Sequence, residues 1–195
     1  MEVLLSVLLG IIITRVTLFI IDGQNNWSSF MASIKSQSGS SDPDAELLTQ
    51  LGQPTHVVGN INFYKNMPLE VVAATGGAFY LPNAKVICVN RNKECEILGL
   101  PLPNKSVIMH ECGHAFFGHK NMTNWVVANI NECMADTFSM IRCKNFNILR
   151  FILSVLETAK VENPNGYKLH WIRVQYLKVL VLLFNINVRK EINDA

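Results

Sequence analysis

The chain has 195 residues and a mass of 21.9 kDa, enough for one compact domain with an appended segment. Hydrophobic residues make up 49% of the sequence and charged residues 16%, so the chain is too apolar to be intrinsically disordered. The formal net charge is +2 without a basic cluster, which disfavours a nucleic-acid-binding protein that relies on phosphate neutralisation. Five cysteines are too few for a disulfide framework, and we expect mostly reduced thiols, with a Cys88–Cys95 bridge as the alternative in an oxidising compartment.

The N-terminal segment is the most apolar part of the chain. Residues 3–21 carry a single charge, Arg15, and a helix of that length would span about 28 Å, close to the hydrocarbon thickness of a bilayer. Our first interpretation is therefore a single-pass membrane anchor over residues 1–22, and the basic residues that follow favour a cytoplasmic domain. A cleaved secretion signal and a buried β-branched segment of a soluble cytoplasmic protein stay open as alternatives.

Residues 23–44 are rich in serine, which is typical of a flexible linker to a domain over residues 45–195. Asp42 and Pro43 predict the start of a short helix over residues 44–51, which Gly52 ends. We expect an α+β fold, in which a small antiparallel sheet precedes a helical core. The pattern predicts strands over residues 55–64, 69–74, 78–81 and 85–89, and helices over residues 105–118, 124–143, 146–161 and 168–188.

Two histidines in the helix predicted over residues 105–118 have the spacing of metal ligands. His110 and His114 are four residues apart, so their imidazoles project from one helix face within reach of one Zn²⁺. Glu111 points about 100° away around the helix axis, where it can accept a proton from water without binding the metal. Cys112 faces away from His110, which favours core packing over metal binding. The alternative is that the spacing of the two histidines arises by chance and that both lie on the solvated face of a helix.

Glu132 is the predicted third ligand. It lies 18 residues after His114, and a turn near residues 120–124 would let the next helix return and bring this carboxylate opposite the histidines. Asp136 is one helical turn further on the same face and is expected to accept the free N–H of a ligating histidine, although both carboxylates could instead form a solvated acidic face. A third histidine six residues after His114 would fall at Lys120. His119 misses that position by one residue, so we interpret it as a structural or outer group.

The motif pair HECGH and NECMAD resembles the glutamate-ligand zinc peptidases, or gluzincins, and among them the CAAX-prenyl-protease/HtpX group and the compact minigluzincins. The similarity covers about residues 45–180 and includes His119 and the segments 77–90 and 173–177. The resemblance also implies a residue that stabilises the oxyanion. Tyr167 stands where the group has a histidine, and His170 and Arg173 are the other candidates.

The motif and the resemblance together predict a metalloendopeptidase with one zinc ion in its helical core, Glu111 as general base, and a peptide or protein as substrate. The peptide is expected to add antiparallel to an edge strand near residues 78–80. The alternative is a zinc-bearing binding or regulatory module without catalysis, although a structural zinc site has no need of Glu111. A membrane-anchored protein with an accidental motif is the remaining interpretation.

Overall fold

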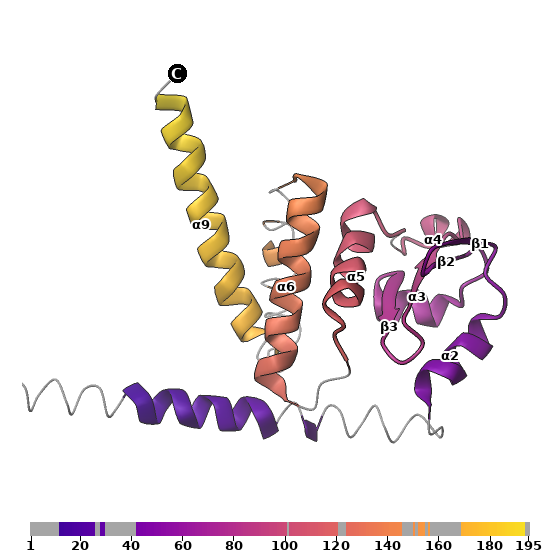
Figure 1. Cartoon of the computed structure of the whole chain (residues 1–195), viewed down its shortest axis with the longest axis horizontal. Coiled ribbons are helices and arrows are strands. Elements are labelled where there is room, and N and C mark those ends of the chain that lie inside the picture. The colour runs from indigo at the N-terminus through magenta and orange to yellow at the C-terminus, as the bar shows by residue number, and fades with distance from the viewer. Residues whose placement is uncertain are drawn as a thin grey trace, which may run out of the picture.

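The computed structural model describes residues 12–25, 28–29, 42–100, 102–120, 124–145, 150, 152–154, 156 and 169–193. It has a small sheet with short helices, followed by the long helices α5 (Lys105–Phe117), α6 (Trp125–Cys143) and α9 (Trp171–Asn193). Figure 1 shows these three helices side by side, with α5 between the sheet and α6, and α6 between α5 and α9. The predicted α+β class is therefore confirmed.

The sheet has four strands in the order β1-β2-β4-β3, which places β3 at an edge. β1 pairs with β2, and β3 with β4, in antiparallel fashion, but β2 and β4 run parallel. The prediction of an antiparallel sheet is therefore wrong. Parallel neighbours need a crossover connection, and here α3 and β3 lie between the paired strands along the chain. The sheet and its helices comprise α2 (Pro43–Leu51), β1 (His56–Val58), β2 (Ile61–Tyr64), α3 (Leu69–Thr75), β3 (Ala78–Leu81), β4 (Val86–Asn90) and α4 (Glu94–Ile97).

Two of the predicted strands need correction. The predicted strand over residues 69–74 is the helix α3, which starts after Pro68 and ends at Gly76, whose φ is 67°. The adjacent β-branched residues Val71 and Val72 favoured a strand there. However, a proline before the first turn and a glycine after the last turn are typical boundaries of a helix. The strand predicted over residues 55–64 is the β1–β2 hairpin, which turns at Gly59. The predictions for β3, β4 and α2 are confirmed to within one residue.

The helices α5 and α6 begin and end close to their predicted limits. Asn104 and Asn124 cap their first turns through side-chain oxygens that accept backbone N–H groups. α5 ends at Gly118, which has a φ of 66°. α9 starts three residues later than predicted and extends to Asn193. The helix predicted over residues 146–161 lies largely outside the described residues, and those described within it are helical.

Residues 12–25 form a helix that lies across the base of α6 and α9 (Figure 1). The Phe19 ring packs edge-on against Trp125 at 5.6 Å and Trp171 at 4.8 Å between ring centroids. The side-chain oxygen of Gln24 accepts the backbone N–H of Trp125 at 2.8 Å. In the part of the chain described, no helix combines the length and the hydropathy that crossing a membrane requires. Residues 1–11 and 30–41, which belong to the predicted anchor and linker, lie outside the described residues.

Candidate metal centre

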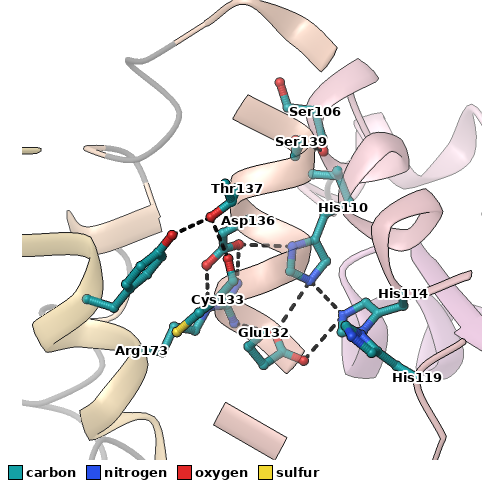
Figure 2. A network of polar contacts seen from close by, with 12 residues as sticks. Ser106, His110, His114, His119, Glu132, Cys133, Asp136, Thr137, Ser139 and Arg173 are labelled. Carbon is teal, nitrogen blue, oxygen red and sulfur yellow. Dashed lines mark hydrogen bonds and ion pairs between the residues drawn. The ribbon is translucent and has the colours of Figure 1, made fainter. Parts of the chain in front are cut away.

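The three predicted ligands converge between α5 and α6 (Figure 2). The Nε2 atoms of His110 and His114 are 3.1 Å apart. Each lies 3.4 Å from one carboxylate oxygen of Glu132, with Oε2 next to His110 and Oε1 next to His114. Ligand atoms held at about 2.05 Å from a tetrahedral ion are roughly 3.3 Å from one another, so these separations fit a single ion of zinc's size. The group could therefore hold a metal ion, as the helical spacing predicted.

The approach of Glu132 depends on close packing between the two helices. A Cβ built at Gly113 of α5 would lie 2.9 Å from the Cα of Ala135 on α6, so no larger residue fits there without displacing backbone. Further along the same interface, the hydroxyl of Ser139 donates a 2.6 Å hydrogen bond to the carbonyl oxygen of Ser106. The glycine inside the histidine motif thus sets the distance across which α6 presents its carboxylate.

Asp136 contacts His110 on the side of the ring opposite the ligand atom. One of its oxygens lies 2.9 Å from Nδ1 of His110, which leaves Nε2 of that ring directed toward Glu132. This is the role predicted for Asp136, and it fixes both the orientation and the tautomer of the ring. Burial acts to lower the pKa of His110, but hydrogen bonds to Asp136 and Glu132 outweigh it and raise that pKa to about 10. In the metal-free protein, His110 therefore carries a proton at neutral pH.

Arg173 joins α9 to the two carboxylates of α6 (Figure 2). Its Nε and one terminal nitrogen donate to the two oxygens of Asp136 at 2.8 Å each, and its other terminal nitrogen lies 2.7 Å from Glu132. Burial would raise the pKa of both carboxyls, but the guanidinium charge holds the pKa of Asp136 below its usual range and that of Glu132 well below it. All three guanidinium nitrogens thus contact carboxylates, so the geometry gives Arg173 a structural role at the site.

His119 lies outside the ligand group, as predicted. The helix does not continue to residue 119, because Gly118 turns the chain back and the His119 backbone N–H bonds to the carbonyl oxygen of His114. Its Nδ1 then lies 2.9 Å from Nδ1 of His114, on the side of that ring away from Glu132. Burial, together with the neighbouring histidine charge, lowers the pKa of His119 to about 4. His119 is therefore neutral at physiological pH and can fix the tautomer of His114.

Glu111 stands beside the ligands without belonging to the group that could hold the ion. Its carboxylate interacts with the backbone of Tyr80 on the edge strand β3. Burial raises the pKa of Glu111 despite the two histidines, which act in the opposite direction. A carboxyl with a raised pKa is suited to taking up and returning a proton near neutral pH.

Tyr167 and His170 were the other candidates for a catalytic role. Tyr167 lies outside the described residues. His170 is half-buried just before α9, and burial and the Arg173 charge lower its pKa.

All five cysteines are free, which agrees with the expectation of reduced thiols. Cys112 packs against the core formed by β3, β4 and α5, and so it faces away from the ligands as predicted.

An apolar groove of about 650 Å³ runs along α6, between the end of α5 and the start of α9. It is lined by residues that include Phe116, Phe117, Met134, Phe138 and Ile141. At 100° per residue, the last three lie roughly 180–240° around α6 from Glu132. The groove is therefore on the opposite side of α6 from the metal centre.

Neither a protein-family profile, nor a curated protein, nor a solved structure matches this chain at a significant level. The assignment of a function therefore rests on the residues of the site and on their geometry.

Proposed function

We propose that the protein is a zinc-dependent endopeptidase. The observation that carries this proposal is the convergence of His110, His114 and Glu132, with Glu111 beside them as a carboxylate that is not needed as a ligand. Two imidazoles and one carboxylate, with a fourth position open, are the donor set of many catalytic zinc sites, whereas structural sites usually fill all four positions with protein ligands. The general base and the metal ligands thus come from two neighbouring helices.

Bound at this site, Zn²⁺ would act as a Lewis acid that polarises the scissile carbonyl and lowers the pKa of water. Glu111 would take the proton from the attacking water and later deliver it to the nitrogen of the leaving amine, so that the base returns to its initial state. Asp136, Arg173 and His119 would hold the ligands in orientation through the contacts described above.

The edge strand β3 is our candidate for binding the substrate backbone. The backbone N–H of Asn90 bonds to the carbonyl oxygen of Gly77, so by alternation Phe79 and Leu81 also direct their backbone groups toward β4. The backbone groups of Ala78 and the carbonyl oxygen of Tyr80 then point outward, next to the Tyr80 backbone N–H that Glu111 accepts. An extended peptide could add to this edge as an antiparallel strand, with its scissile bond next to Glu111.

The decisive experiment combines zinc content with cleavage. The full chain is stripped with a chelator, reloaded with zinc and incubated with a peptide library, and products are mapped by mass spectrometry. We expect one zinc per chain in both the wild type and the isosteric variant Glu111→Gln, with cleavage by the wild type alone. Zinc binding without any cleavage would favour a non-catalytic zinc module, and an absence of zinc binding would make the motif accidental.

We also propose that the helix over residues 12–25 attaches the protein to a membrane. Its side chains at Ile12, Ile13, Val16, Leu18 and Ile21 are more than half exposed, and the preceding residues 3–11 contain no charge. We expect the full chain to float with phosphatidylcholine–phosphatidylglycerol vesicles in a density gradient. A variant with Ile12, Ile13 and Val16 replaced by asparagine should remain in the dense fraction, and a wild-type chain that also remains there would contradict the proposal.

A further inference from the structure

Asn129 is a buried polar residue of α6 with no contact to the ligand atoms. The residue is 2% exposed, and its side chain makes three hydrogen bonds. The amide nitrogen donates to the carbonyl oxygen of Trp125 at 3.0 Å and to that of Leu169 at 2.8 Å. The amide oxygen accepts the backbone N–H of Arg173 at 3.3 Å. Both amide hydrogens and one oxygen lone pair are therefore used.

Two of these three bonds reach the start of α9, which lies 40 to 44 residues later in the chain. The first N–H groups of a helix have no partner within that helix and need one from outside. Asn129 supplies a partner for Arg173, in the first turn of α9, in the way that an N-cap residue does, but from the neighbouring helix. The indole N–H of Trp125 donates to the same carbonyl oxygen of Leu169 at 2.8 Å, and so it supports the same junction.

The position of Asn129 on α6 links this junction to the metal centre. Glu132 and Asp136 follow it by three and seven residues, so all three side chains lie on one face of the helix. The same face therefore carries an anchor for the backbone of Arg173 and two carboxylate partners for its guanidinium. The place where α9 begins therefore sets the position from which the guanidinium contacts both carboxylates.

We propose that Asn129 is a positioning residue of the metal site, which fixes the start of α9 so that Arg173 holds Glu132 and Asp136 in place for the ion. This inference rests on the proposed zinc site and adds a residue to its support. The orienting partners of metal ligands typically change metal affinity by about 10- to 100-fold when they are removed. Asn129 acts on the ligands through Arg173, so the loss of its amide should weaken zinc binding by an amount within this range.

The test compares Asn129→Leu with Thr137→Val in the full chain. Thr137 hydrogen-bonds to Tyr176, so its replacement by valine also removes a polar contact between α6 and α9 but leaves Arg173 untouched. The zinc dissociation constant is measured by competition with a chelator, and thermal unfolding of the metal-free protein reports stability. We expect Asn129→Leu to raise the dissociation constant about tenfold or more, and Thr137→Val to change it by less than about twofold.

A second background separates positioning from general stability. If Asn129 acts through Arg173, adding Asn129→Leu to Arg173→Met should change the dissociation constant by less than about twofold relative to Arg173→Met alone. An undiminished effect in that background, or an unchanged dissociation constant in Asn129→Leu itself, would overturn the inference. Where Asn129→Leu does not fold, Asn129→Ala, which also removes both the donor and the acceptor, replaces it in both backgrounds with the same expected results. A wild-type chain that binds no zinc would overturn the proposed function as well, whereas an unchanged Asn129 variant overturns this inference alone.

Discussion

Replacing Gly113 with alanine tests whether the separation of α5 and α6 controls the metal site. The added Cβ would lie 2.9 Å from the Cα of Ala135, 3.1 Å from the Cβ of Phe138 and 3.3 Å from the carbonyl oxygen of Ala135. Ordinary contacts begin near 3.4 Å. Two of the three neighbours are backbone atoms and the third is a Cβ, none of which can rotate away, so the helices must separate by about 0.5 Å, the difference between 3.4 and 2.9 Å.

Two opposing contributions set the size of the effect on stability. Overpacking of this kind costs about 1–3 kcal/mol, whereas alanine is a better helix former than glycine by about 1 kcal/mol. The net loss in the free energy of unfolding should therefore be about 0–2 kcal/mol. Metal–ligand distances tolerate deviations of only about 0.2 Å. A shift of the histidines away from Glu132 should therefore weaken zinc binding by about 10- to 100-fold. Zinc affinity should thus change more clearly than stability.

Thermal unfolding of the metal-free protein and chelator competition for zinc measure the two effects separately. Ser139→Ala is the matched control, because it removes a hydrogen bond from the same interface without adding volume. We expect it to lower the free energy of unfolding by about 1 kcal/mol and to leave zinc affinity unchanged. Wild-type zinc affinity in the Gly113→Ala variant would refute the argument that helix separation places Glu132.

Three further predictions concern the ligands and their surroundings. Zinc binding near pH 7 should release about one proton, because the pKa of His110 is raised to about 10 and the metal binds the neutral ring. The association constant should then rise about tenfold per pH unit between about pH 6.5 and 8.5. Calorimetry in buffers of different ionisation enthalpy measures the protons released, and an affinity that does not change with pH would contradict the reasoning. Asp136→Asn should weaken zinc binding about 10- to 100-fold, since His110 loses its charged partner, and an affinity within twofold of the wild type would disagree with the geometry. A Cys112→Ser, Cys133→Ser double variant should still bind one zinc with wild-type affinity, and loss of zinc from it would identify a thiolate ligand.

The local parts of the site could be predicted from the sequence because they depend on helix geometry alone. A spacing of four residues places His110 and His114 on one face wherever the helix lies, and the same spacing relates Glu132 to Asp136. Joining the two pairs needed one further assumption, an antiparallel return between the helices. This return is present, because Ser106 of α5 lies next to Ser139 of α6 whereas Gly113, later on α5, lies next to the earlier Ala135. The resulting arrangement is the group that could hold a metal ion.

The incorrect predictions concern the pairing of strands in the sheet and the helix α3, which was expected to be a strand. Whether β2 pairs with β4 in parallel depends on the path of the chain through α3 and β3, which no local pattern encodes. The prediction that His119 lies outside the ligand group was correct, and Gly118 was the signal that the helix would stop before this residue and that the chain would turn.

The supporting residues were harder to identify. Arg173 was one of three candidates for stabilising the oxyanion, because a sequence does not show that two carboxylates on α6 already bind the guanidinium of this residue from α9. Asn129 was missed altogether. Its only signal was an amide side chain three residues before Glu132, on the helix face that carries the predicted ligand and its neighbour Asp136. Buried amides of this kind need partners, and their partners come from tertiary structure.

X-ray absorption at the zinc edge, measured on the zinc-loaded full chain, tests the central claim most directly. The arrangement of His110, His114 and Glu132 predicts two imidazole nitrogens and at least one oxygen at about 2.0–2.2 Å, and no sulfur. Replacement of Glu132 by alanine should remove the protein oxygen while the two imidazole signals persist at reduced occupancy. A sulfur atom at about 2.3 Å, or a shell without imidazole, would contradict the assignment of these three residues as the ligands.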